Sequence, residues 1–281
     1  MAAVGDLIIN VGSVGDSERI DANSHSLQDR IRYNILAATT DLALRVHESP
    51  QGKAHLVTVG KKIVNGARQH NRGDIIIYND SEARFDHWVG FFLDKLRKDF
   101  PVVYLEEGME DQAEAFVRRK KEYNVDRLED FKPKRAATLH IHRTLVDNMV
   151  HAQGQKDKDG NQPQLARNTY EVLKFQMIIV IAHEIVHYLT SFLLGRFPNG
   201  DVCLTPPGLT VPRYEDSEAG RYWELTALGG LVEFWAVKNH KLGNRQSGEA
   251  YVFVNTRDET PGSRVCEAHI RDINSGCKQA H

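Results

Sequence analysis

Cysteine is scarce in this sequence of 281 residues, and the formal net charge is only −2. The three cysteines, Cys203, Cys266 and Cys277, are too few and too widely spaced for a disulfide framework or a cysteine-rich zinc finger. We expect free thiols, with a Cys266–Cys277 pair as the alternative in an oxidising compartment. The small net charge gives no reason to expect nucleic acid or an anionic membrane as a partner.

Long apolar runs and a leader are also missing from the sequence. The longest uninterrupted apolar run covers residues 177–182, far fewer than the roughly 20 that cross a bilayer. The N-terminus lacks a basic start, and Gly5, Asp6, Asn10 and Gly12 interrupt its apolar stretch. We therefore expect no signal peptide and no transmembrane segment, and either a cytoplasmic protein or the processed form of a secreted one.

What the sequence does contain is an alternation of β-rich apolar runs with amphipathic runs, which predicts both strands and helices. We predict strands at residues 6–10, 55–59, 74–78, 101–105 and 136–142, and helices at 26–48, 81–98, 110–123 and 144–152. A long buried helix is expected at 168–195, capped by Asn168 with Glu171, and another at 215–239. A strand at 251–255 and a short helix at 264–273 follow.

The motif His-Glu-Ile-Val-His occupies residues 183–187, in the middle of the predicted helix 168–195. On a helix, His183 and His187 lie on one face about one turn apart, so both imidazoles reach one cation. Neutral imidazole suits Zn²⁺, and Glu184 points aside, where it can take a proton from a metal-bound water. We predict one zinc ion bound by His183 and His187, with Glu184 as general base. The alternative is a buried set of two histidines and a glutamate that hydrogen-bond to other groups.

A catalytic zinc usually has a third protein ligand, and the motif does not continue as HExxHxxGxxH. A carboxylate from the later helix is therefore expected. We favour Glu218, because Ala219 and Gly220 after it allow close approach to the metal helix. The alternatives are Glu224 first, and then Asp216, Glu215 or a more distant residue.

These residues resemble the zincin metallopeptidases, and among them the gluzincins, over about residues 168–239. The resemblance implies His183, His187 and Glu218 as zinc ligands and Glu184 as the general base. The 31 positions from His187 to Glu218 exceed the spacing of thermolysin-like enzymes and approach that of some toxin-type zincins. The resemblance to zincins also implies one α+β domain over residues 1–281, in which the metal helix packs beside a mixed sheet that includes residues 136–142. An elaborated α/β part (1–152) would precede a metal-binding helical part (164–281).

The function expected from this site is hydrolysis of a peptide bond in a peptide or protein substrate. A second electrophile commonly shares the charge of the transition state. The candidates are Tyr214, Arg221, Tyr222, His240, Tyr251 and His269. Two alternatives remain: a non-haem iron or zinc enzyme that acts on a small molecule, and a non-catalytic, zinc-stabilised binding protein.

Three smaller features also carry expectations. His140 and His142 alternate on a predicted strand, which favours a solvent-facing pair over a second metal site. The basic run at residues 118–121 is interpreted as a solvated helix end rather than a nucleic-acid site. Gly229 and Gly230 would allow close helix packing or mark a kink in the last long helix.

Overall fold

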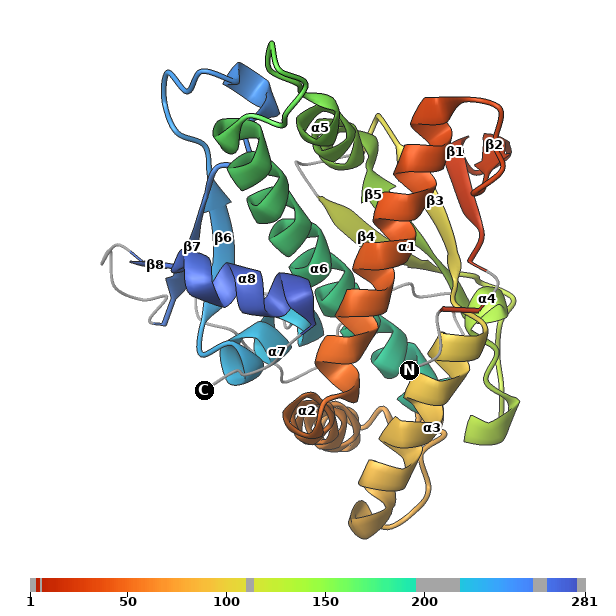
Figure 1. Ribbon diagram of the computed structural model, residues 1–281. Coiled ribbons are helices and arrows are strands. Elements are labelled where there is room, and N and C mark those ends of the chain that lie inside the picture. The colour runs from red at the N-terminus through yellow and green to blue at the C-terminus, as the bar shows by residue number, and fades with distance from the viewer. Residues whose placement is uncertain (1–3, 6, 110–113, 196–217, 255–261, 277–281) are drawn as a thin grey trace.

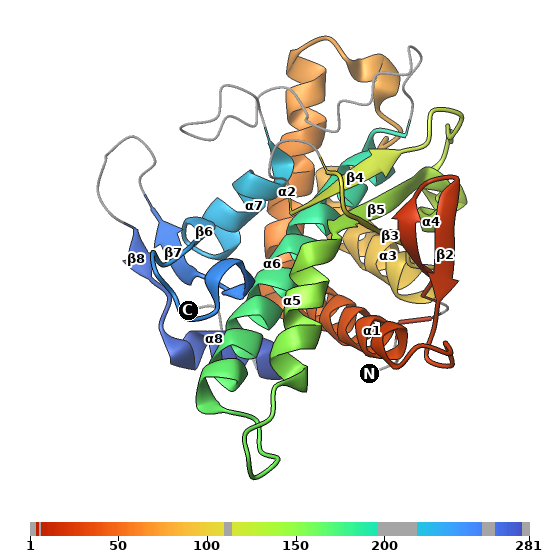
Figure 2. The same ribbon diagram turned by 90° about the horizontal axis from the view of Figure 1, so that it is seen from above.

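The computed structural model describes residues 4–5, 7–109, 114–195, 218–254 and 262–276. It combines a five-stranded mixed sheet, a set of helices and a small second sheet (Figures 1 and 2). One helix, α6 (Gln164–Leu193), runs between the two sheets in both views. The prediction of an α+β protein is therefore confirmed at this level.

The larger sheet has the strand order β2-β1-β3-β5-β4. Its strands are β1 (Ile9–Ser13), β2 (Asp16–Ile20), β3 (Val102–Glu106), β4 (Ala115–Arg119) and β5 (Ala137–His142). The three middle strands are parallel, whereas β2 and β4 run antiparallel at the two edges. Strands predicted at 101–105 and 136–142 are confirmed, and the one predicted at 6–10 begins three residues later.

Helices pack around α6 and join it to the larger sheet. They are α1 (Leu27–Glu48), α2 (Pro50–Gln69), α3 (Phe85–Lys98) and α5 (Arg143–Gly154). Helices α1, α2 and α5 contact α6, and so does the edge strand β4. Short helices complete this part: η1 (Gly73–Ile75), η2 (Glu82–Arg84), η4 (Leu128–Asp130) and α4 (Pro133–Ala136). The predicted helices at 26–48, 81–98 and 144–152 are thus found within a few residues.

Three predictions in this half are wrong. The strand predicted at 55–59 lies inside α2, which Ser49 caps and Pro50 begins, so the helix-start signal outweighed the β-branched composition. The segment 74–78 forms no strand and begins within η1. The helix predicted at 110–123 is wrong because residues 115–119 form β4; its Val117 and Arg119 are buried, which is the two-residue period of a strand.

The C-terminal part contains more strand than expected, so the expectation of a mainly helical part is wrong, whereas the strand predicted at 251–255 and the helix predicted at 264–273 are found at 249–253 and 267–275. The helix predicted at 215–239 is only α7 (Ala219–Ala227). Gly229 follows with φ +75°, a left-handed backbone conformation at which the chain turns away from the helix direction. Gly230 then packs against Val252, where a side chain would overlap the neighbouring strand. An antiparallel sheet of β6 (Leu231–Trp235), β7 (Glu249–Phe253) and β8 (Ser263–Arg264) follows, with η5 (Gly243–Arg245) and α8 (Glu267–Ser275).

Helix α6 begins at Gln164 with Pro163 at its N-cap, four residues before the expected start, so the predicted cap at Asn168 is wrong. By length and composition alone α6 could cross a membrane, but 72% of its most apolar 18-residue window is buried inside the protein. It carries much of the main hydrophobic core, in which Ile178, Ile181 and Phe192 are fully buried.

Candidate metal centre

The two motif histidines are among the few residues in the second half of α6 that are not fully buried. From Ile181 to Leu193, only His183 and His187 are partly exposed, with 16% and 13% of their side chains accessible. Their rings lie 5.3 Å apart between centroids, as expected for residues one turn apart on one face. An otherwise apolar helix therefore presents two imidazoles at one accessible place.

Glu218 reaches the same place from the start of α7. It is the N-cap residue of this helix, with extended backbone, and its carboxylate accepts hydrogen bonds from the backbone N–H groups of Gly220 and Arg221. A carboxylate at this position also interacts favourably with the positive end of the helix dipole. The start of α7 thus fixes the orientation of Glu218.

The three side chains form a compact set of donor atoms. Oε1 of Glu218 lies 2.6 Å from Nε2 of His187 and 3.4 Å from Nε2 of His183. One ligand atom from each residue lies within 4.8 Å of the other two. Two imidazole nitrogens and one carboxylate oxygen at this spacing can hold one divalent cation. The favoured third-ligand candidate is therefore in reach of both histidines.

Glu224, the second candidate, occupies a different place in the site. Its Oε1 accepts a hydrogen bond from Nδ1 of His183 at 2.6 Å, on the ring edge away from Nε2. Its Oε2 accepts bonds from the backbone N–H of Val232 at 3.0 Å and from Arg221 at 3.1 Å. Glu224 is only 2% exposed. This buried carboxylate fixes the ring of His183 with Nε2 directed toward Glu218 and His187.

The lack of a side chain at Gly220 allows α7 to approach α6. A Cβ atom added there would lie 2.6 Å from Cε1 of the His183 ring and closer still to Nε2 and Cδ2. Such distances are well inside van der Waals contact, so a side chain would displace the imidazole. The expectation that small residues after Glu218 permit close helix approach agrees with this geometry.

Glu184 lies beside the three candidate ligands and is 5% exposed. Its Oε1 is 4.0 Å from Nε2 of His183. Its Oε2 is buried and has no hydrogen-bond partner among the residues that the structure describes. A buried carboxylate oxygen without a donor is costly, so a water or another polar ligand is expected to bind there.

Electrostatics in the site favour bound positive charge. Burial lowers the pKa of His183, but Glu218 and Glu224 outweigh this effect and raise it well above its usual value. Burial raises the pKa of Glu218, yet His183 and His187 outweigh it and hold the carboxyl well below its normal range. The two carboxylates that face His183 are thus ionised and stabilise positive charge there, either a proton on the His183 ring or a bound cation that replaces it.

The other candidates for charge stabilisation are scattered. Arg221 pairs with Glu224 and, at 3.4 Å, with Glu233. Tyr222 packs half-buried against the main core, and Tyr251 donates to Glu249 in the small sheet. His269 lies on α8, and His240 lines a separate pocket. Tyr214, Glu215, Asp216, Cys203 and Cys277 lie outside the described residues.

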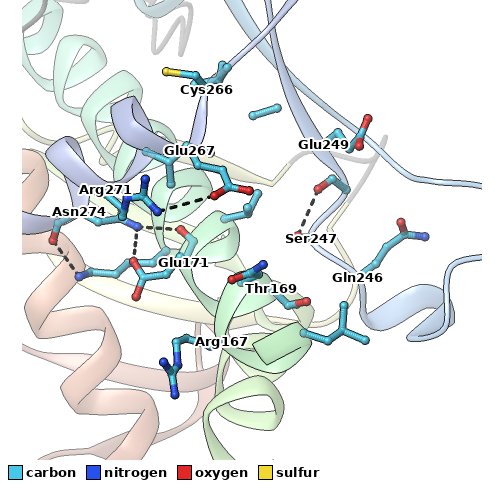
Figure 3. Close-up of a pocket in the computed structure, with 18 of the residues that line it drawn as sticks. Arg167, Thr169, Glu171, Gln246, Ser247, Glu249, Cys266, Glu267, Arg271 and Asn274 are labelled. Atoms are coloured by element: carbon cyan, nitrogen blue, oxygen red, sulfur yellow. Dashed lines mark hydrogen bonds and ion pairs between the residues drawn. The ribbon is translucent and has the colours of Figure 1, made fainter. Parts of the chain in front are cut away.

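That separate pocket has a volume of about 1150 Å³ and lies between the first turns of α6, the small sheet and α8 (Figure 3). Its α6 residues end at Lys174, nine positions before His183, or about 13 Å along the helix. Among the groups that line it, Asn274 donates to Glu171, and Arg271 pairs with Glu267 at 3.6 Å. The pocket is therefore distinct from the candidate metal centre.

The interpretation of His140 and His142 as a solvent-facing pair is wrong. His140 is fully buried between the rings of Tyr104 and Phe116 and is hydrogen-bonded to Glu106 and Thr138, so it does not face solvent. His142 instead caps α5.

The basic run at 118–121 does not form a helix end. Arg119 is buried in β4 and donates to the carbonyl oxygens of Leu194 and Gly195. There it satisfies carbonyl groups at the C-terminal end of α6.

Comparison with protein-family models, curated proteins and solved structures found no match. The interpretation of the centre therefore rests on its own residues and geometry.

Proposed function

We propose that this protein is a zinc-dependent metallopeptidase in which Glu184 handles the protons of peptide-bond hydrolysis. One observation carries the proposal. His183, His187 and Glu218 converge beside a buried oxygen of Glu184 that lacks a donor among the described residues. A metal-binding set next to an unsatisfied carboxylate is the arrangement that activation of a water requires.

The donor set suits zinc. Catalytic zinc typically takes three protein ligands, with nitrogen and oxygen atoms about 2.0–2.2 Å from the metal. In a tetrahedron of that size the ligand atoms are about 3.4 Å apart. Oε1 of Glu218 is 3.4 Å from Nε2 of His183 and 2.6 Å from Nε2 of His187, so the Glu218 and His187 side chains would move apart by about 1 Å around the ion. When bound, zinc would lower the pKa of a coordinated water and polarise the substrate carbonyl.

The chain's own groups would manage the remaining chemistry. Glu184, whose buried Oε2 lacks a partner among the described residues, would accept a proton from the attacking water and return it to the leaving amine. Glu224 would keep Nε2 of His183 directed at the metal position. The main core around α6 would hold both groups in place during turnover.

The edge strand β4 supports a peptide as the substrate. It contacts α6, pairs with β5 along one edge, and has no strand on its other edge within the described part of the chain. An extended peptide can add to such an edge through backbone hydrogen bonds. A small-molecule substrate would need no such template.

The test combines metal analysis with hydrolysis of a mixed peptide library. We expect about one zinc per chain, lost in His183→Ala, and cleavage that falls about 10²–10⁴-fold in Glu184→Gln with zinc retained. Glu267→Gln on the exposed surface of α8 is the control and should behave as the unmodified protein.

Activity that requires Fe(II) and O₂ would instead favour the iron enzyme. A zinc-loaded protein that cleaves nothing would favour the binding protein.

A further inference from the structure

The pocket beside α8, with its volume of about 1150 Å³, has room for a small organic molecule. Its walls are the first three turns of α6, the small sheet with the loop before β7, and α8 (Figure 3). Leu165 and Val237 line it while 41% and 39% exposed, and large apolar side chains exposed around a cavity are typical of binding sites. Further apolar lining comes from the smaller core, through Val172, Ala250, Val265 and Ile270.

The start of α6, which lines this pocket, favours negative charge. Pro163 is its N-cap residue and provides no side-chain hydrogen bond, and the first turn contains no acid. The first N–H groups of a helix have no partner within the helix, and the helix dipole attracts an anion to them. Here a cation follows instead: Arg167 is exposed, lines the pocket and pairs with no acid among the described residues. This positive end of α6 is therefore available to an anion.

The remaining charged side chains around the pocket do not offset this positive charge. Four cationic side chains line the pocket against three acidic ones: Arg167, Lys174, Arg264 and Arg271 against Glu171, Glu249 and Glu267. Two of these acids form ion pairs with two of the cations, at N···O distances of 2.9 Å and 3.6 Å. The third, Glu171, accepts a hydrogen bond from Asn274. Arg167 and Lys174 are left without an acidic partner in the part of the chain that the structure describes.

Thr169 gives an independent indication that a polar ligand binds here. It is only 4% exposed, yet it lines the pocket, and its hydroxyl has no hydrogen-bond partner among the residues that the structure describes. Figure 3 shows Thr169 on the side of α6 that lies across the pocket from Gln246 and Ser247. A buried hydroxyl without a partner is costly, and a polar group of a ligand would satisfy it.

We propose that this pocket binds an organic anion with an apolar body, such as a carboxylate on a hydrocarbon chain. The anionic group would lie at the start of α6, where Arg167 and the Thr169 hydroxyl can reach it. The apolar body would lie against the aliphatic lining, which includes Leu165 and Val237. Because the pocket is separate from the candidate metal centre, this proposal does not depend on the peptidase activity.

Competition for a fluorescent dye tests the proposal. The dye is anilinonaphthalene sulfonate, itself an apolar anion, and the competitors are decanoate, decanol and decyltrimethylammonium, which share one chain length and differ in charge. We expect decanoate to displace the dye at about tenfold lower concentration than the other two, because hydrogen bonds to a charged group are stronger than neutral ones. Equal displacement by all three, or no displacement by decanoate, would overturn the proposal.

Two variants show where the anion binds. Arg167→Gln, at an exposed position where folding should not be impaired, is expected to remove most of the preference for decanoate over decanol. Arg127→Gln is the matched control, because this arginine is also exposed but does not line the pocket. A preference that is unchanged in Arg167→Gln would contradict the assignment.

Ser247→Trp should weaken binding of the dye and of decanoate together, because the indole would fill part of the pocket. Treatment with a chelator should change neither affinity. Loss of binding on chelation would place the anion at the metal centre instead, and dye affinity unchanged in Ser247→Trp would place it elsewhere on the protein.

Discussion

If the centre binds zinc as proposed, replacing Glu224 by Gln should weaken that binding by about 10–100-fold while all three proposed ligands remain in place. The carboxylate accepts hydrogen bonds from His183, Val232 and Arg221, the first to Oε1 and the others to Oε2. An amide has a single acceptor oxygen, so its NH₂ group must face either the His183 N–H or the Val232 N–H. A buried donor left without an acceptor costs about 1–3 kcal/mol, which is about 5–150-fold in a binding constant.

Competition with a chelating dye measures this zinc affinity directly. Glu233→Gln is the matched control, because Glu233 pairs with the same Arg221 yet makes no contact with His183. We expect the control to stay within about threefold of the unmodified protein, as for other partly exposed ion pairs. If Glu224→Gln binds zinc as tightly as the wild type, Glu224 does not orient His183 and the reasoning is wrong.

Two further variants test the surroundings of the centre. Gly220→Ala should weaken zinc binding and destabilise the protein by about 1–3 kcal/mol, because the new methyl group overlaps the His183 ring. Chelator competition measures the zinc affinity, and thermal unfolding measures the stability. The control is Gly90→Ala in α3, where the nearest atom is 3.8 Å away, and this variant should be neutral or stabilising. Burial lowers the pKa of His47 to about 4. Between about pH 6.5 and 4, the unfolded chain therefore binds a proton that the folded protein does not. About 3 kcal/mol of stability that is present above about pH 6.5 is lost as the pH falls through this range. In urea titrations at pH 7 and pH 4.5, His47→Gln should lose less stability on acidification than the wild type, and an identical loss would contradict this assignment.

Part of the candidate site could be predicted because its information is local. The four-residue spacing of His183 and His187 places both rings on one face of any helix. Their helix was predicted because its apolar residues cover every side. Glu218 was favoured because Gly220 follows it, and the ring of His183 indeed packs against that glycine. These inferences required only spacing and side-chain size.

The role of Glu224 depends on contacts that no local pattern shows. Its partner Val232 belongs to β6, which the sequence suggested was part of a helix. Only the turn at Gly229 brings that N–H group back to α7. The strand β4 was missed for a related reason, because its segment has the charge pattern of a surface helix and yet forms an edge strand. Tertiary burial overrides local propensity in both cases.

Glu218 is both a candidate metal ligand and the N-cap residue of α7, and these two roles constrain any attempt to redesign the centre. A histidine at this position could supply an imidazole and convert the site to three nitrogens. It could not accept hydrogen bonds from both Gly220 and Arg221, as the carboxylate does. The first turn of α7 would then lose its cap, and with it the support that holds Glu224 against His183. Altering the metal preference of the proposed centre would therefore require rebuilding the start of α7 as well as exchanging a candidate ligand.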